Sequence, residues 1–391
     1  MDPIVFDAAP RLPRGFSCAS RNCGLKESGP DLALFHSEVP AQAAALFTRN
    51  HVAGAPVLVG RELIRGGVLR AVVVNSKVSN VGTGEQGIAA ARRMGAAAAR
   101  ELGVPAEHVL MSSTGVIGRQ LPIEKIEAGL AGMRGELQPD PLVGARGIMT
   151  TDTYPKALSL AVGDAVVCVV AKGSGMVEPN LATVLIYIFT DALLPRGAAD
   201  ALLRRAADVS FNMLSVDSDT STSDTCALLA NGLAGEVDAE TFERALTAAC
   251  IRMAEMLARD GEGATKLLRA RVAGAASAAE ARAVAKSIIN SPLVKTMAYG
   301  ADPNIGRILM AVGKCFACDV DASRLRVAVS GMPVWAGGAR LDYDDGDLRE
   351  RLRGDPVDIE VDLGLGTFMA TAFGCDLTHG YIDENAAYYS S

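Results

Sequence analysis

The chain has 391 residues, of which 49% are hydrophobic and 21% charged, and its formal net charge is −7. This length suffices for two domains, or for one large layered body with a sizeable core. The negative charge argues against nucleic-acid and membrane-surface partners, because such partners select a basic surface. No apolar run approaches the roughly 18 residues of a membrane span, and the N-terminus lacks the basic start of a secretion signal. We therefore expect a cytoplasmic protein.

Predicted strands alternate with predicted helices along most of the chain. The first 70 residues mix short apolar runs with Gly and Pro, which indicates strands and loops. Beyond them we expect strands at 71–74, 109–111, 165–170, 184–189 and 357–361, and a hairpin around Gly331. We expect helices at 88–102, 198–214, 239–259 and 277–290, and another helix that begins at Pro122. The polar segment 215–225 is too short and too closely flanked by apolar residues to be a disordered linker. This alternation predicts an α/β or α+β protein with mixed sheets.

A glycine-rich loop at 172–183 leads into the apolar run 184–189, so Thr183 stands where a loop enters the core. Its hydroxyl could simply cap or start the strand by bonding to the backbone. Alternatively, Thr183 could be a nucleophile whose base is its own α-amine, released by cutting the Ala182–Thr183 bond. An α-amine titrates near pH 8, so one residue can supply both groups at neutral pH. The residues alone leave both interpretations open.

Other chemical signals are weaker. The chain has only four histidines, none in a triad or ligand motif, so the base of an enzyme here need not be imidazole. Cys315 and Cys318 have metal-binding spacing, but no second pair and no nearby His completes a zinc site, and we expect no metal and no bound cofactor. The polar loop after the strand at 109–111 could aim backbone N–H groups at an oxyanion, although such loops are common.

The polar loops form a series of blocks that spans nearly the whole chain. They lie at 83–87, 113–118, 149–156, 172–183, 219–225, 260–266, 291–296 and 300–304. In this order they resemble the ArgJ family, the ornithine acetyltransferases, also called bifunctional glutamate N-acetyltransferase/amino-acid acetyltransferase. Two positions depart from the family pattern, because Ile305 stands where Trp is usual and the chain ends in two serines. These departures leave the acyl donor and acceptor open.

The resemblance implies an N-terminal-nucleophile-like α–β–β–α sandwich, of the kind shared with the DmpA-type aminopeptidases. It also implies an autocatalytic cut between Ala182 and Thr183. The cut would give an α chain of residues 1–182 and a β chain of residues 183–391. The two chains would form one intertwined catalytic body and assemble as an α2β2 heterotetramer.

The resemblance further implies an activity and a set of site residues. The activity is ping-pong acetyl transfer from N-acetyl-L-ornithine to L-glutamate through an acetyl ester on Thr183, in arginine biosynthesis. The partners would be small amino acids and N-acetyl amino acids, and acetyl-CoA stays open as a second acetyl donor. Thr114 and Gly115 would form the oxyanion hole. Substrate contacts would come from Thr150, Lys172, Thr183, Glu262, Asn385 and Ser390.

The chemistry agrees with these roles, but each of the following residues also has an alternative interpretation without a role in the site. Lys172 could hold a substrate carboxylate or lower the pKa of the nucleophile, or it could be a surface lysine. Glu262 could pair with the amino group of ornithine, or it could be an exposed carboxylate in a turn. Asn385 and Ser390 could belong to a frayed tail.

Three kinds of function remain open. The first is the acetyltransferase, including a paralogue that acts on another N-acyl amino acid in a secondary pathway. The second is an aminopeptidase or amidase on the same scaffold, in which water takes the acyl group. The third is a non-catalytic binding protein with an uncut loop.

Overall fold

The computed structural model describes residues 4–178 and 184–386, and the chain divides into two compact units. Each unit is built from separate stretches of sequence. Unit 1 consists of Met1–Gly173, Pro179–Asn212 and Thr220–Met253, and unit 2 of Ser174–Glu178, Met213–Asp219 and Ala254–Ser391. The chain therefore leaves unit 1 directly after the residue that follows Lys172, and returns to it before the apolar run at 184–189.

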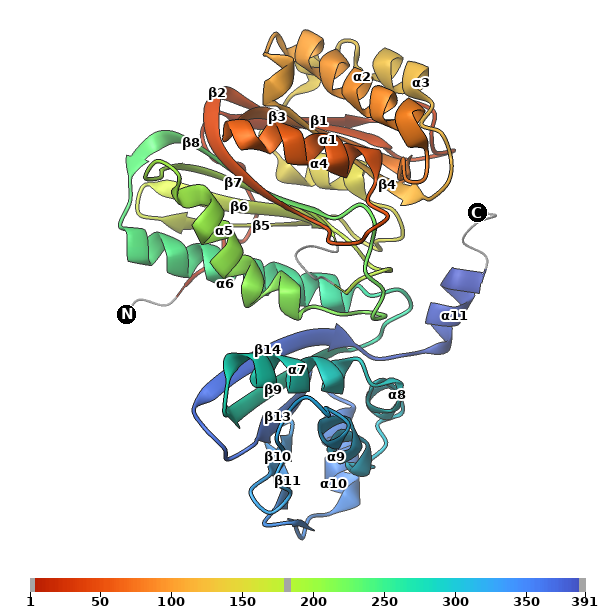
Figure 1. The fold of residues 1–391 in the computed structure, drawn as a ribbon, viewed down its shortest axis with the longest axis vertical. Coiled ribbons are helices and arrows are strands. Elements are labelled where there is room, and N and C mark those ends of the chain that lie inside the picture. Colours follow the sequence, from red (N-terminus) through yellow and green to blue (C-terminus); the bar gives the residue numbers. More distant parts are fainter. Residues whose placement is uncertain (1–3, 179–183, 387–391) are drawn as a thin grey trace. The chain divides into compact units, whose positions relative to one another are not determined.

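Unit 1 contains an eight-stranded sheet in the order β4–β3–β2–β8–β7–β6–β5, with β1 paired to β2 (Figure 1). Its strands are β1 (Phe16–Arg21), β2 (Leu32–Phe47), β3 (Val68–Val78), β4 (Val109–Val116), β5 (Lys156–Val162), β6 (Ala165–Lys172), β7 (Leu185–Leu193) and β8 (Thr225–Glu236). The pairs β3–β4 and β7–β8 are parallel and the others antiparallel, which confirms the predicted mixed sheet.

The sheet of unit 1 curves around a shared core. The ring of Phe35 on β2 lies 5.3 Å from that of Phe189 and 5.6 Å from that of Tyr187, both on β7. Phe35 lies in the half of β2 that pairs with β1, whereas β8 pairs with the other half, Gln42–Phe47. The ring contacts therefore pack the first half of β2 against β7. Ala145 and Ile148 of α4 (Pro141–Ile148) pack into the same cluster.

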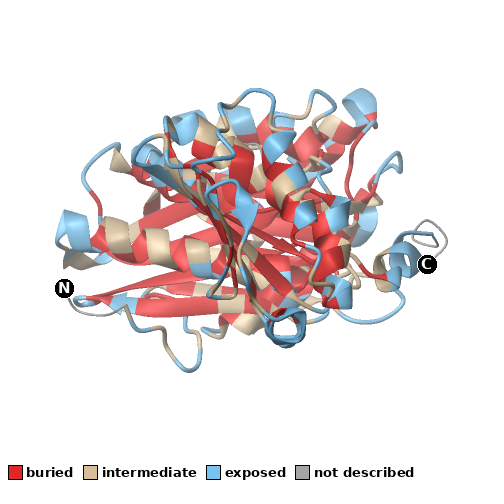
Figure 2. Ribbon diagram, turned by 90° about the horizontal axis from the view of Figure 1, so that it is seen from below, coloured by how far each residue is buried: buried red, intermediate tan, exposed pale blue. Residues whose placement is uncertain are grey.

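Helices cover both sides of this sheet. Besides α4 they are α1 (Ala55–Leu63), α2 (Gly84–Leu102), α3 (Ile123–Leu130), α5 (Ala198–Asp208) and α6 (Ala239–Arg259), whose last residues belong to unit 2. Figure 1 shows α1, α2 and α3 on the outer side of the β2–β4 region, and α5 and α6 on the outer side of the β5–β8 region. This layering agrees with the expected α–β–β–α sandwich. In Figure 2 most strand residues are buried, and exposed residues lie mainly on the helices and loops.

Unit 2 contains a six-stranded sheet in the order β12–β11–β10–β13–β9–β14. Its strands are β9 (Leu267–Ala275), β10 (Arg326–Val329), β11 (Met332–Ala336), β12 (Ala339–Arg340), β13 (Val357–Asp362) and β14 (Phe368–Cys375), and its helices are α7 (Ala278–Ile289), α8 (Pro292–Gly300), α9 (Gly306–Gly313), α10 (Asp345–Leu352) and α11 (His379–Ala386). The predicted hairpin is the antiparallel pair β10–β11. The predicted cap is also confirmed, because Ser277 accepts a hydrogen bond from the backbone N–H of Glu280 at the start of α7.

Three local predictions differ from the structure. The region predicted as strands and loops contains α1 at Ala55–Leu63. The helix predicted at 198–214 ends at Asp208 and is followed by a separate 3-10 helix, Phe211–Met213. Pro122 is the N-cap of α3 rather than its first helical residue.

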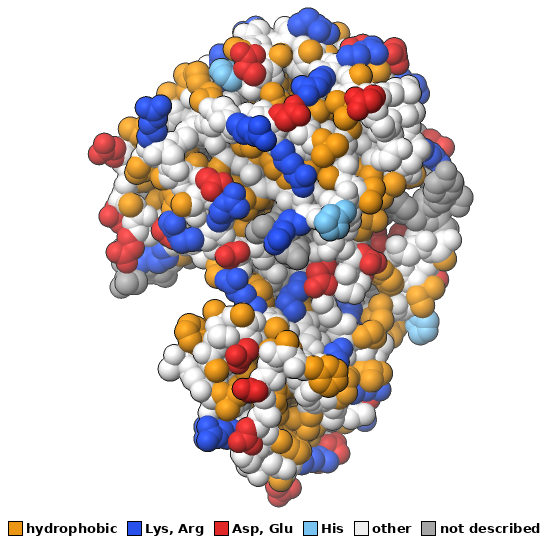
Figure 3. Space-filling view, in the orientation of Figure 1, with side chains coloured by type: hydrophobic (Ala, Val, Ile, Leu, Met, Phe, Trp, Pro, Cys, Tyr) orange, Lys and Arg blue, Asp and Glu red, His pale blue; other side chains and the backbone are white. Residues whose placement is uncertain are grey.

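The polar segment 215–225 is ordered, as predicted. In unit 1, the hydroxyl of Thr48 donates to the carbonyl of Ser221 over 2.6 Å. In unit 2, Asp217 accepts hydrogen bonds from the backbone of Met176 and Val177. Within the described parts of the chain, no helix combines the length and the hydrophobicity required to cross a membrane. Lys, Arg, Asp and Glu side chains are interspersed on the face drawn in Figure 3.

Candidate active site

Thr114 and Gly115 lie near the end of β4, opposite Ser76 and Lys77 of the parallel strand β3. Gly115 has a φ of 124°, and a Cβ atom built on it would lie 2.2 Å from the carbonyl carbon and oxygen of Lys77. Only glycine fits this backbone conformation and this close approach. Both Thr114 and Gly115 are partly exposed, whereas the residues just before them are buried.

Lys172, the last residue of β6, brings Thr114 and Thr150 together. Its side-chain Nζ donates to the hydroxyl of Thr150 over 2.7 Å and lies 3.5 Å from the hydroxyl of Thr114. Four strands separate β4 from β6 in the order of the sheet, so only the curvature of the sheet makes these contacts possible. Lys172 is 8% exposed, which excludes the alternative of a surface lysine. The structure thus gathers Thr114, Gly115, Thr150 and Lys172 in unit 1.

The buried carboxylate of Asp152 binds the backbone next to Thr150 and Lys172. Its Oδ1 accepts hydrogen bonds from Nζ of Lys156 at 2.7 Å and from the N–H of Gly173 at 2.8 Å, and its Oδ2 accepts from the N–H of Thr150 at 3.0 Å. Burial alone would raise the pKa of Asp152, but the positive charges of Lys172 and Lys156 outweigh it and lower this pKa to about 2. Asp152 therefore stays ionised and fixes the backbone beside both Thr150 and Lys172.

Lys26 adds positive charge from a distant part of the sequence. Its Nζ donates to the carbonyl oxygens of Met149, over 2.7 Å, and of Pro30, over 3.1 Å. Burial lowers its pKa to about 8, helped by the charges of Lys172 and Lys77, while Asp31 and Asp152 act in the opposite direction. Sequence analysis missed Lys26 and the supporting role of Asp152. Asp152 lies within a recognised block, but no local signal marks Lys26.

Asp224 is a buried carboxyl group next to the start of β7. It is 2% exposed, and its Oδ2 has no hydrogen-bond partner among the described residues. Burial raises its pKa well above the usual range, against smaller opposing effects of the Ser221 and Thr48 hydroxyls and of the Lys172 charge. The next residue, Thr225, donates its N–H to the carbonyl of Val184 over 3.1 Å.

Two further predicted site residues meet in unit 2. Glu262 lies in the turn between α6 and β9, and Asn385 lies on α11. The side-chain amide of Asn385 donates to Oε2 of Glu262 over 2.8 Å. Glu262 is half-buried and its N–H donates to the carbonyl of Ser174 over 2.9 Å. Asn385 thus contacts the turn that contains Glu262.

The remaining predicted positions, Ala182, Thr183 and Ser390, lie outside the described residues. The two ends of the loop that contains Ala182 and Thr183 are described, because Lys172 and Leu185 are paired in the antiparallel ladder of β6 and β7. In the described part of the chain, no group of three or more His, Cys, Asp and Glu side chains is placed to hold a metal ion.

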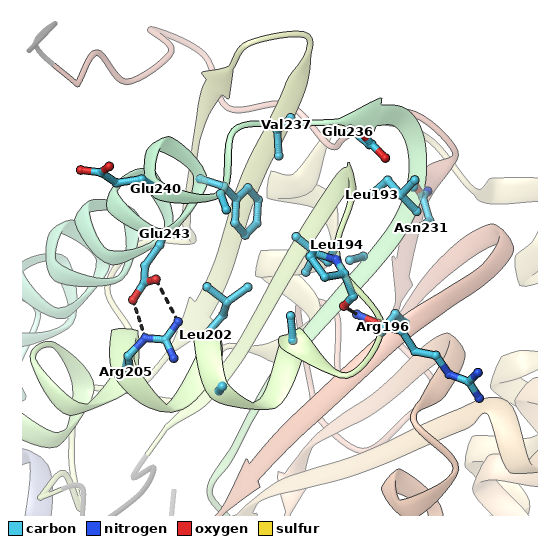
Figure 4. A pocket seen from close by; sticks show the side chains of 18 of the residues that line it. Leu193, Leu194, Arg196, Leu202, Arg205, Asn231, Glu236, Val237, Glu240 and Glu243 are labelled. Carbon is cyan, nitrogen blue, oxygen red and sulfur yellow. Dashed lines mark hydrogen bonds and ion pairs between the residues drawn. The ribbon is translucent and has the colours of Figure 1, made fainter.

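A cavity of about 1080 Å³ lies elsewhere in unit 1, between the ends of β7 and β8 and the helices α5 and α6 (Figure 4). Apolar side chains such as Leu202 and Phe242 form much of its wall. At its rim, Arg205 binds both carboxylate oxygens of Glu243, with an Nη2–Oε2 distance of 2.9 Å. None of the predicted site residues that the structure describes lines this cavity.

Comparison with known proteins agrees with the resemblance seen in the sequence. The ArgJ family model matches residues 17–390. The chain is 45% identical over 380 residues to an arginine biosynthesis bifunctional protein ArgJ from Clostridium acetobutylicum, covering 96% of this chain and 98% of the relative. It is 45% identical over 393 residues to a glutamate N-acetyltransferase from Streptomyces clavuligerus, covering 98% and 100%.

A crystal structure of an arginine biosynthesis bifunctional protein ArgJ from Bacillus halodurans is also similar. It is 38% identical, with a TM-score of 0.50, and the match covers 52% of this chain and 98% of the Bacillus chain. The family model and the sequence relatives each span nearly the whole chain, well beyond the few loops of the candidate site. The chain belongs to the ArgJ family.

Proposed function

We propose that the chain is an acetyltransferase that transfers the acetyl group of N-acetyl-L-ornithine to L-glutamate, as a step of arginine biosynthesis. The observation that carries this proposal is the convergence of Thr114, Gly115, Thr150 and Lys172 in unit 1. Lys172 is also paired with Leu185, so the strand that follows Thr183 starts beside this group. The names of the two sequence relatives described above support the same reaction.

The proposed reaction has two half-steps with a covalent intermediate on Thr183. The Thr183 hydroxyl attacks the acetyl carbonyl of N-acetylornithine while the Thr183 α-amine takes the hydroxyl proton. The tetrahedral oxyanion is stabilised by the Thr114 hydroxyl and the Gly115 N–H. The C–N bond then breaks and the nitrogen of ornithine leaves with that proton. In the second half-step the amine of glutamate attacks the acetyl ester, which releases N-acetylglutamate and returns the proton to the Thr183 oxygen.

The nucleophile must first be freed by self-cleavage. We propose that the Thr183 hydroxyl attacks the carbonyl of Ala182, that the amide nitrogen departs as the new α-amine, and that water hydrolyses the resulting ester. The length of the Bacillus chain supports such a cut, because 98% of that chain is matched by only 52% of this one. The β chain proposed here, residues 183–391, contains 209 residues (391 minus 182) and would be about the same share.

The proposed α and β chains would each contribute to both units. Ser174–Glu178 of the α chain belongs to unit 2, and β7 and β8 of the β chain belong to unit 1. Strand β6 of the α chain is hydrogen-bonded to β7 of the β chain. These ladder bonds would hold the two chains together after the cut, which supports one intertwined catalytic body. The α2β2 assembly is proposed on the family resemblance alone, and the cytoplasmic location on the sequence features described at the outset.

Charged groups in each unit suit the proposed substrates. In unit 1, Lys172 and Lys26 supply positive charge near Thr150, which suits the α-carboxylate of both substrates. Glu262 accepts a hydrogen bond from Asn385 within unit 2. Its contact with the free ammonium group of ornithine is proposed on the family resemblance. Ser390 is proposed as a further substrate contact. Acetyl-CoA remains open as a second acetyl donor.

An acceptor-dependence assay tests the proposed function. The purified protein should consume N-acetylornithine and produce N-acetylglutamate in equal amounts, and consumption should become slow when glutamate is omitted. Turnover that does not depend on an amine acceptor would instead identify an amidase or aminopeptidase on the same scaffold. An intact chain without turnover would favour the third alternative, a non-catalytic binding protein.

A further inference from the structure

Gly175 lies directly against the carboxylate of Glu262 in unit 2. A Cβ atom built on Gly175 would lie 2.1 Å from Oε2 of Glu262, 2.2 Å from its Cδ and 2.3 Å from its Oε1. Cβ atoms in proteins essentially never approach another heavy atom closer than 3.0 Å. The Glu262 carboxylate can therefore occupy its observed position only because residue 175 has no side chain.

The position of this carboxylate is fixed from two directions. The backbone of Gly175 bounds it on one side, and the amide of Asn385 donates to its Oε2 over 2.8 Å. The main chain of Glu262 is tied to the same segment, since its N–H donates to the carbonyl of Ser174 over 2.9 Å. The segment Ser174–Glu178 thus contacts both the carboxylate and the main chain of Glu262.

Hydrogen bonds from neighbouring residues fix the backbone of the segment Ser174–Glu178. The carboxylate of Asp217 accepts the N–H groups of Met176 at 2.6 Å and Val177 at 2.8 Å, and Val216 donates its N–H to the carbonyl of Val177 at 2.7 Å. A methyl group added at Gly175 would therefore displace the end of the flexible Glu262 side chain rather than the backbone. Gly175 does not have a left-handed backbone conformation, so alanine fits its φ angle.

We infer that Gly175 is a positioning residue that gives the enzyme its preference for a cationic acyl donor, by leaving room for the Glu262 carboxylate. This inference rests on the proposed function, in which Glu262 pairs with the ammonium group of ornithine. Under the proposed cleavage, Gly175 belongs to the α chain and Glu262 to the β chain. The α-chain segment that precedes the cut then helps to determine substrate specificity in the mature enzyme.

The test compares two acyl donors that differ by one charged group. N-acetylnorvaline has the carbon chain of N-acetylornithine without its terminal ammonium group. In Gly175→Ala, the KM for N-acetylornithine should rise roughly 10- to 100-fold, as for loss of a hydrogen bond to a charged group. The kcat/KM for N-acetylnorvaline should change little. Gly313→Ala is the matched control, because a Cβ on Gly313 meets nothing within 4 Å, and it should behave as the wild type.

Double variants show whether Gly175 acts through Glu262. In a Glu262→Gln background, which itself should lose the preference for the cationic donor, Gly175→Ala should have no further effect on that preference. All constants are expressed per cleaved chain, counted by denaturing mass spectrometry. If Gly175→Ala alone is not cleaved, the shorter side chain in Gly175→Ala/Glu262→Asp should restore cleavage, and failure to do so contradicts the inference.

The outcomes separate this inference from the proposed function. A wild-type protein that does not transfer acetyl groups between these amino acids contradicts the proposed function. A wild-type enzyme that prefers N-acetylornithine, together with a Gly175→Ala variant that keeps the full preference, contradicts the inference alone. A Glu262→Gln variant that keeps the preference also contradicts it, because Gly175 would then have no charged group to position.

Discussion

Replacing Asp152 by Asn should lower the stability of the protein, because Asp152 holds the backbone beside the candidate active site. The substitution leaves the reacting groups themselves unchanged. The side chains of Asp152 and Lys156 are both fully buried and lie 2.7 Å apart. Asparagine has one acceptor oxygen and one donor group, so it cannot accept hydrogen bonds from both Thr150 and Gly173 as the carboxylate does. The buried ammonium group of Lys156 also loses the negative charge of Asp152.

Two estimates bound the size of the effect. Removing one partner of a buried ion pair typically costs about 3–5 kcal/mol. The lowering of the Asp152 pKa from 3.8 to about 2 corresponds to about 2 kcal/mol of stability at neutral pH. We therefore expect Asp152→Asn to reduce the free energy of unfolding by about 2–5 kcal/mol at pH 7. Because the pKa is lower in the folded state, this contribution is complete above pH 3.8 and is lost as the pH falls to about 2.

Urea denaturation followed by circular dichroism measures this difference. The difference in free energy of unfolding between wild type and Asp152→Asn should be the same at pH 7 and pH 5 and should become smaller at pH 3. The exposed Asp164, in the turn between β5 and β6, provides a control, and Asp164→Asn should change stability by less than about 0.5 kcal/mol. A gap below about 1 kcal/mol at pH 7, or one that does not narrow below pH 3.8, would refute the assigned role of Asp152.

Substitutions at three further residues test the reacting groups and a proposed substrate contact. Thr114→Val should lower kcat about 10²–10³-fold with little change in KM, because it removes one oxyanion donor and keeps the shape; a normal kcat with a lowered melting temperature would make Thr114 a structural residue. Thr183→Ala should give an uncut, inactive protein, whereas Thr183→Ser should still cut, because serine keeps the reactive hydroxyl; denaturing electrophoresis and the transfer assay show which occurs. Lys172→Met should raise the KM for N-acetylornithine about tenfold or more, as expected when a charged hydrogen-bond donor is lost, and an unchanged KM would remove Lys172 from substrate binding.

The strands around the candidate site were predictable because their sequences carry little ambiguity. The runs at 165–170 and 184–189 are apolar throughout and rich in β-branched residues, as expected for strands buried on both faces. The first lies in β6, and the second lies in β7 except for Val184, which directly precedes that strand. Helix α1 was missed for a physical reason. Its Gly60 reads as a loop residue in the sequence, but a Cβ there would lie 2.9 Å from the ring of Phe47, so glycine serves the packing of the helix.

The residues of the candidate site were predictable from their sequence blocks, but their arrangement was not. Thr114, Thr150 and Lys172 meet although four strands separate β4 from β6 in the order of the sheet. The contact of Lys26 with the carbonyl of Met149 joins residues 123 positions apart. Neither periodicity nor residue spacing encodes contacts of this kind, so the charges that surround Thr150 could be found only in the fold.

The central claim is that Thr183 becomes the first residue of a separate chain and carries the acetyl group. Denaturing mass spectrometry of the purified protein, before and after incubation with N-acetylornithine without an acceptor, tests this claim most directly. We predict two fragments, residues 1–182 and 183–391, with the second gaining the mass of one acetyl group after incubation and losing it when glutamate is added. A single intact chain, or an acetyl group that appears on the first fragment, would contradict the account.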